Sequence, residues 1–187
     1  MSSTKWNLDT THSIAEFAVK HLMISTVKGR FKTVSGTAET DAAGTLKSAS
    51  VTIDVASIDT NVEARDTHLR SADFFDVATF PSMTFTSTKI EQSGDEISVT
   101  GDFTMRGVTK PLTMKGEITG TMTDPWGMSR AAINVSAKIK RSDWGLTWNA
   151  ALETGGVVVG DEVKITLEAE AVAEKAAVPA KEVAAAV

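Results

Sequence analysis

The sequence predicts an all-β protein: an antiparallel β-barrel of about eight strands with a short helical segment inserted near residues 60–80. The first observation behind this prediction is that apolar and polar residues alternate with period two over most of the chain, as they do in half-buried strands. The second is that short, turn-rich links of the hairpin type join these segments. A meander of this kind avoids exposed edges by closing on itself, and about eight strands enclose room for one small ligand.

The strands follow one another in a regular order along the chain. The turn Ser93–Glu96 joins two of them as a hairpin, and the turn Asp124–Gly127 joins two more. One face of each strand is almost wholly apolar, and Gly101, Gly116 and Gly120 fall on that face, where they leave room or permit bends. The clearest alternation covers residues 15–21, 51–55, 83–88, 97–105, 112–122, 133–139 and 163–169.

One long segment, residues 56–85, interrupts the alternation. It begins with a helix-like run, Val62–Arg70, and continues into a short apolar turn, Asp73–Val77. Phe80 and Pro81 then end the turn, and the strand pattern resumes at Met83. A charged and aromatic interruption of this length in a β chain usually closes one end of the β structure or guards its mouth. We therefore expect function where this segment meets the barrel interior.

Composition sets the limits of class and compartment. The 187 residues fit one domain over residues 1–171, followed by an Ala/Glu/Lys-rich tail over residues 172–187. A net charge of −5 and the absence of a basic, aromatic-rich cluster argue against nucleic acid as a partner. There is no cysteine, which removes disulfides, thiolate catalysis and cysteine-ligated zinc. Without a secretory leader or a long apolar run, the sequence predicts a cytoplasmic protein, or a periplasmic one if a leader was removed.

The sequence offers little for catalysis. His12, His21 and His68 do not share metal-ligand spacing on any one element, and there is no phosphate-binding loop or nucleophile elbow. The cluster Arg65, Asp66 and His68 fits a general acid–base group, but charges of this kind more often anchor a helix to a barrel. We expect Arg65 and Asp66 to form a buried ion-pair network with Arg141. We therefore predict no catalytic residue, no bound metal and no cofactor.

The predicted ligand-binding residues are the apolar strand positions together with aromatic residues of the irregular segments. Methionines among them serve either as core filler or as an adaptable lining for an irregular ligand. Phe74 and Phe75 diverge by about 100° in a helical turn, so we expect one of them to form a gate with help from Trp144. The predicted set is Phe17, Val19, His21, Val51, Ile53, Val55, His68, Phe74, Phe75, Met83, Phe85, Phe103, Met105, Met114, Ile133, Val135 and Trp144.

The motifs of the chain resemble those of the YceI-like, polyisoprenoid-binding family over about residues 4–171. Asp9-x-x-His12-Ser13 and the run from Val19 to Phe31 look like the family's opening. Its most specific segment is similar to residues 57–85, with Arg65-Asp66-x-His68-Leu69, Asp73-Phe74-Phe75-Asp76 and Phe80-Pro81. The likeness continues through residues 101–111, 141–149 and 159–163. One departure is Trp144, where the family more often has Phe or Tyr.

The resemblance implies an extended lipocalin-like barrel whose apolar tunnel holds a long-chain isoprenoid lipid, such as a polyprenyl or quinone tail. It also implies a homodimer without enzyme activity, and we expect transient membrane contact from such a carrier. Two other classes stay open: an enzyme acting on an isoprenoid quinone, and a binding protein for another amphiphile, such as a fatty acid or amide, with a stress-response role. An enzyme needs polar side chains converging inside the cavity, whereas a simply packed barrel has no cavity.

Overall fold

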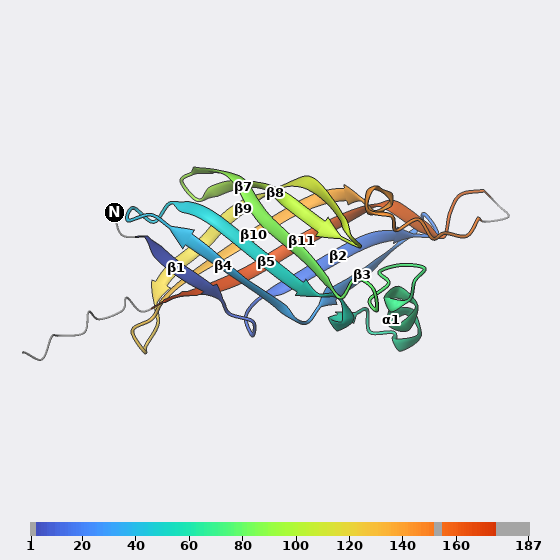
Figure 1. Cartoon of the computed structure of the whole chain (residues 1–187), viewed down its shortest axis with the longest axis horizontal. Coiled ribbons are helices and arrows are strands. Elements are labelled where there is room, and N and C mark those ends of the chain that lie inside the picture. Colours follow the sequence, from blue (N-terminus) through green and yellow to red (C-terminus); the bar gives the residue numbers. More distant parts are fainter. Residues whose placement is uncertain (1–2, 152–154, 175–187) are drawn as a thin grey trace, which may run out of the picture.

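The structure is a computed structural model that describes residues 3–151 and 155–174 (Figure 1). Within these residues, eight antiparallel strands close into a barrel, and the last of them pairs with the first. This confirms the predicted barrel. In their order around the barrel, the strands are β1 (Thr4–Leu8), β4 (Val34–Thr40), β5 (Leu46–Asp54), β7 (Ser82–Ser93), β8 (Glu96–Met105), β9 (Val108–Thr123), β10 (Ser129–Lys140) and β11 (Val159–Ala173).

Three further strands extend the barrel at one end. They are β2 (Ile14–His21), β3 (Ser25–Phe31) and β6 (Ile58–Asp59). β11 pairs with β2 through its first two-thirds and with β1 at its end, so β1 and β2 act as one interrupted strand. In the same way β3 continues into β4, and β5 continues into β6. The interruptions let the barrel elongate beyond its closed part.

The predicted helical segment lies at this extended end of the barrel (Figure 1). It contains the helix α1 (Glu63–Arg70), which begins one residue later than predicted, and the 3-10 turn η1 (Val55–Ser57) precedes it. A second irregular segment begins with the 3-10 turn η2 (Arg141–Trp144) after β10. No helix among the described residues is long and apolar enough to cross a membrane.

Period-two alternation places the core inside the barrel. The inward side chains of β8, from Ile97 to Met105, are buried, while their neighbours on the outer face are more exposed. Gly101 lies beneath the ring of Phe85, and a Cβ at this position would stand 2.6 Å from Phe85 Cζ. Gly29 likewise lies beneath the ring of Phe17, where a Cβ would clash with the ring. The glycines therefore let two aromatic rings lie flat against the wall of the barrel.

The boundary of the predicted tail falls inside the last strand. β11 continues to Ala173, two residues past the predicted boundary, and pairs there with Trp6 of β1. The remaining part of the predicted tail, residues 175–187, lies outside the described residues.

Candidate ligand-binding site

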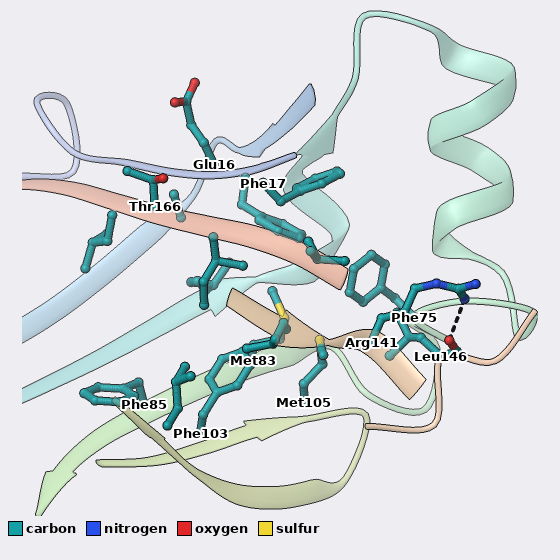
Figure 2. Close-up of a pocket in the computed structure, with 18 of the residues that line it drawn as sticks. Glu16, Phe17, Phe75, Met83, Phe85, Phe103, Met105, Arg141, Leu146 and Thr166 are labelled. Atoms are coloured by element: carbon teal, nitrogen blue, oxygen red, sulfur yellow. Dashed lines mark hydrogen bonds between the residues drawn. The ribbon is translucent and has the colours of Figure 1, made fainter. Parts of the chain in front are cut away.

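A cavity of about 150 Å³ lies inside the barrel beneath the helical segment; we name it the proximal chamber. Figure 2 shows aromatic and methionine side chains converging on it from opposite walls. Glu16 and Thr166 border the chamber, but the carboxylate of Glu16 points away from it (Figure 2). The lining residues are Ala15, Glu16, Phe17, Val19, Phe31, Val51, Ile53, Leu69, Phe74, Phe75, Met83, Phe85, Phe103, Met105, Leu112, Met114, Ile139, Arg141, Leu146, Val159, Val163, Ile165, Thr166 and Leu167.

A second cavity of about 170 Å³, the distal chamber, lies toward the β1 end of the barrel. Val51 and Leu167 line both chambers, so the two adjoin across these side chains. The distal wall contains many small residues, which leave room inside the barrel. Its lining residues are Trp6, Leu8, Gly36, Thr37, Ala38, Thr40, Gly44, Leu46, Ala49, Ser50, Val51, Ile118, Thr121, Ala131, Ile133, Leu167, Ala169 and Ala171.

The segment over residues 60–80, which we name the lid, closes the proximal chamber with aromatic rings. Phe75 meets Phe31 edge-on, with ring centroids 5.8 Å apart, and both rings line the chamber. Phe74 lies 5.1 Å from Trp148 and 5.1 Å from His68, again between ring centroids. Both phenylalanines therefore contact the chamber, and Phe74 also joins an outer aromatic cluster.

Hydrogen bonds within the lid join its first residue, Thr60, to α1. The carboxylate of Asp66 accepts from the backbone N–H and the hydroxyl of Thr60, and Arg65 donates to the hydroxyl and the carbonyl of the same residue. Asp66 and Thr60 are both buried. The predicted ion-pair network of Arg65, Asp66 and Arg141 is therefore wrong: the two lid charges meet at Thr60, and Arg141 lies elsewhere.

Two further arginines hold the lid through backbone carbonyls. Arg70 donates to the carbonyl of Ala56 at 3.0 Å and to that of Ile58 at 2.9 Å. Arg106, in the β8–β9 turn, donates to the carbonyl of Ala72 at 2.8 Å and to that of Gly145 at 2.6 Å. Arg106 therefore joins the lid to the irregular segment after β10.

Arg141 connects the irregular segment after β10 to the start of β11. Its guanidinium donates to the carbonyls of Leu146, Trp148, Val159 and Gly160, and the side chain reaches toward Leu146 at the edge of the proximal chamber (Figure 2). Burial lowers the pKa of Arg141, because desolvation disfavours the charged guanidinium, and the negative charge of Asp161 opposes this effect. Its role in the structure is to tie loop to strand, since its donors are directed at backbone oxygens.

Twelve of the 17 predicted ligand-binding residues line the two chambers. Eleven of them line the proximal chamber, and Ile133 lines the distal chamber. For the residues that lie on strands, this position follows from alternation, which directs every second side chain inward, whereas Phe74 and Phe75 come from the lid. The eleven are Phe17, Val19, Val51, Ile53, Phe74, Phe75, Met83, Phe85, Phe103, Met105 and Met114.

Five predicted residues lie outside both chambers. His21 ends β2 beside the hairpin turn, and Val55 is fully buried in η1, with its N–H bonded to Pro81. His68 bonds to Asp73 and meets Trp148 edge-on outside the lining. Val135 is a core residue of β10. Trp144 donates its indole N–H to the carbonyl of Phe103, lies against Lys110, and has Phe103 as its ring neighbour.

The residues at the site that the sequence did not predict include two groups. Val163, Ile165 and Leu167 occupy the apolar phase of a predicted strand, so the sequence signal for them was present. Leu146, which lines the proximal chamber, and Trp148, which packs on Phe74 outside the lining, lie in the irregular segment after β10, where no periodicity predicts side-chain direction. Trp148, rather than Trp144, is the aromatic neighbour of Phe74.

One histidine–carboxylate cluster lies at the distal end of the barrel: Asp9, His12 and Glu170. Arg130 already lies among these groups, bonded to Asp9 at 3.0 Å and also to Glu170 and Asp124. Hydrogen bonds from Thr11 and His12, together with Arg130, hold the pKa of Asp9 well below its usual range. The guanidinium therefore supplies positive charge that balances these carboxylates.

The chain is similar to known proteins over nearly its whole described length. A family model described as "YceI-like domain" matches residues 6–171. Protein YceI of Salmonella newport is 39% identical over 88% of this chain and 83% of its own. The crystal structure of Burkholderia cenocepacia BcnA has a TM-score of 0.75 at 27% identity, covering 87% of this chain and 98% of BcnA. A domain from Saccharophagus degradans, described as polyisoprenoid-binding, shares the fold with a TM-score of 0.66 at 20% identity. The match covers 90% of this chain and 98% of that domain.

Proposed function

The chain belongs to the YceI-like family, and from that premise we propose that its barrel binds a long-chain isoprenoid lipid and carries it unchanged. The observation that carries this proposal is the pair of adjoining apolar chambers that share Val51 and Leu167. Each methylene group that leaves water stabilises binding by about 0.8 kcal/mol. A chain that fills both chambers therefore binds tightly without any charged contact.

The length of the tunnel favours a ligand longer than a fatty acid. β11 lines both chambers, from Val159 in the proximal chamber to Ala171 in the distal chamber. At the rise of a β-strand this path is roughly 40 Å, or roughly 30 Å along the axis of a typically tilted barrel. An acyl chain of one bilayer leaflet spans only about 15 Å, half of the hydrocarbon core. A polyprenyl chain or quinone tail uses the whole path, whereas an ordinary fatty acid uses about half of it.

Flexible side chains allow the tunnel to widen for such a ligand. Each chamber alone is about the size of a cavity that takes one benzene molecule, so a long chain requires movement of the lining. Met83, Met105 and Met114 line the proximal chamber, and unbranched thioethers adapt to irregular shapes at low cost. The branched isoprenoid chain is a ligand of this irregular kind.

The side chains at the chambers support binding rather than catalysis. In the described part of the chain, the polar side chains at the proximal chamber belong to Glu16, Arg141 and Thr166. Glu16 points away, and the donors of Arg141 are directed at backbone carbonyls. The distal chamber adds only hydroxyl groups and the indole of Trp6. Among the described residues no acid–base pair converges on the tunnel, so an enzyme acting on an isoprenoid quinone is the weaker alternative.

Native mass spectrometry of protein purified from its host tests the ligand directly. We expect an adduct whose extracted mass is that of a polyprenyl compound or an isoprenoid quinone. The same spectrum reads the oligomeric state, which we propose to be a homodimer. Recovery of a fatty acid or amide instead would replace the isoprenoid proposal with the other amphiphile class.

A blocked tunnel tests the use of both chambers. Ala169 is buried and lines the distal chamber, so Ala169→Phe should fill that chamber alone. We expect at least tenfold weaker binding of a fluorescent long-chain polyprenyl probe and unchanged binding of a geranyl probe. Glu168→Phe is the matched control, because Glu168 is the exposed neighbour on β11. Equal loss of both probes in the folded Ala169→Phe variant would contradict a ligand that spans the two chambers.

A further inference from the structure

The turn between β2 and β3 exposes three consecutive apolar side chains, Leu22, Met23 and Ile24. Ile24 is 84% exposed and Met23 is 60% exposed. The backbone N–H of Leu22 donates to the carbonyl of Val158 at 2.9 Å, which brings the exposed side chain of Val157 to the same surface. We name these four residues the apolar tip. The β2–β3 end lies at the same end of the molecule as α1, and therefore at the lid end (Figure 1).

The requirements of the fold do not explain these residue types. Leu22 and Met23 have φ angles of 51° and 62°, in the left-handed region that Gly, Asn and Asp adopt most readily. Tight hairpin turns favour the same small or polar residues. An Asn or Gly would suit both the backbone and the solvent better than Leu or Met. The side chains are therefore better explained by an apolar partner outside the molecule.

The charges beside the tip indicate the chemistry of that partner. Between Glu16 and Glu39 every charged residue is a lysine or arginine, although the chain as a whole carries −5. Arg30 and Lys32 pair with Asp59. Lys20 and Lys28 are exposed and form no ion pair with a described residue. The nearby acids of β11 are engaged: Asp161 accepts from Ser142, and Glu162 pairs with Lys138.

We propose that the apolar tip inserts into the interface of an anionic lipid bilayer, with Lys20 and Lys28 at the level of the headgroups. Apolar side chains flanked by lysines bind such interfaces through buried apolar area together with attraction to anionic lipids. The lid end of the barrel then faces the membrane. A second copy of this chain fits the surface less well, because a stable interface covers about 800 Å² per partner and the tip is the end of a single hairpin.

Flotation with lipid vesicles tests this surface without any tunnel ligand. The vesicles contain phosphatidylcholine either alone or with 30% phosphatidylglycerol. We expect the wild-type protein to float with the anionic vesicles, and the double variant Met23→Asn, Ile24→Ser to bind at least tenfold less. Asn suits the left-handed backbone at this position, so the variant should keep its melting temperature. Lys20→Gln with Lys28→Gln should weaken binding to anionic vesicles only, and added salt should have the same effect.

The opposite end of the barrel supplies the matched control. Met122 and Trp126 near the β9–β10 turn are 61% and 79% exposed. Met122→Ser with Trp126→Ser should leave flotation unchanged. The proposal is overturned if wild-type protein does not float, if the Met122 and Trp126 variant loses binding, or if the tip variant changes the oligomeric state in gel filtration without changing flotation. Probe binding in solution is unaffected by any of these outcomes, so the tunnel and the tip are tested separately.

Discussion

Thr60 is the first residue of the lid, and the buried carboxylate of Asp66 accepts two hydrogen bonds from it. Asp66→Ala leaves two buried donors of Thr60 without that acceptor. We expect a loss of about 2–4 kcal/mol in the free energy of unfolding, because buried groups without partners lose their hydration. For a chain of this size the melting temperature should fall by about 5–15 °C. Calorimetry measures the fall, and probe titration should show little change in affinity at a temperature where the variant is folded.

Asp66→Asn is the matched control, since Thr60 donates both hydrogen bonds to Oδ1 and an amide oxygen, although uncharged, has two lone pairs to accept them. It should destabilise less than Asp66→Ala. If Asp66→Ala weakens probe binding strongly while the melting temperature stays constant, Asp66 belongs to the binding site and not to the scaffold.

The carboxylate of Asp124 makes the distal end of the barrel sensitive to acid. Arg130 at 2.8 Å and the backbone N–H groups of Met128 and Trp126 keep the pKa of Asp124 below its usual range. A carboxyl whose pKa is lower in the folded state stabilises the fold above its unfolded pKa of about 3.9, and this stability is lost as pH falls through the folded value. We expect the melting temperature to fall on acidification below about pH 4.

Asp124→Asn should lower the melting temperature at pH 7 and make it less dependent on pH below 4. Asp95→Asn, at an exposed turn position, is the control and should follow the wild type. Parallel curves for Asp124→Asn and the wild type between pH 2 and pH 7 would show that Asp124 does not carry this dependence.

At the scale of elements, the lid is the part of the wall that we expect to open for a ligand. Its ring Phe75 contacts Phe31 across the proximal chamber, while Phe80 packs on Gly107 away from it. We expect Phe75→Ala to release a fluorescent polyprenyl probe at least tenfold faster in stopped-flow measurements, with an unchanged far-UV spectrum. The physical reason is that the small side chain no longer closes the path over the bound chain.

Phe80→Ala is the matched control because it removes a half-buried ring from the same lid without opening the chamber. It should lower stability but leave the release rate close to that of the wild type. Equal acceleration by both variants would mean that lid stability, and not the ring at the chamber, sets the rate.

The elements also show which parts of the structure the sequence could predict. Period-two alternation identified β2, β5 and β7 to β11, and it assigned Phe85 and Phe103 to the inner face. It missed β4, whose inward residues Gly36 and Ala38 are too small to give an apolar signal. Those small residues create the distal chamber, so the same property that hides the strand provides the space.

Irregular segments limited the prediction of the site. Trp148 became the neighbour of Phe74 only through the path of a loop, and no periodicity describes such a path. Arg141 was expected to meet a carboxylate, but its partners are backbone carbonyls. Every residue has a carbonyl, so a partner of this kind leaves no mark in the sequence. The contacts of Trp148 and Arg141 could therefore be identified only from the structure.

At the scale of the whole molecule, the interrupted strands give the barrel two different ends. β2, β3 and β6 extend beyond the closed part and lie with the lid and the apolar tip at one end. The other end holds the Arg130 cluster and the distal chamber. A chain that enters beneath the lid must therefore pass Val51 and Leu167 before it reaches the distal chamber. In the proposed binding mode, the proximal chamber therefore fills before the distal chamber.

This order predicts how stability depends on ligand length. Geranyl, geranylgeranyl and longer polyprenyl alcohols, compared at equal free concentration, should raise the melting temperature progressively, because a tighter ligand shifts unfolding further. Each additional buried methylene adds up to about 0.8 kcal/mol, until the chain fills the path of roughly 30 Å and the increase stops. In Ala169→Phe the increase should stop at a shorter chain length, and in Glu168→Phe it should match the wild type. If the melting temperature stops rising at the same short length in all three proteins, the ligand occupies the proximal chamber alone.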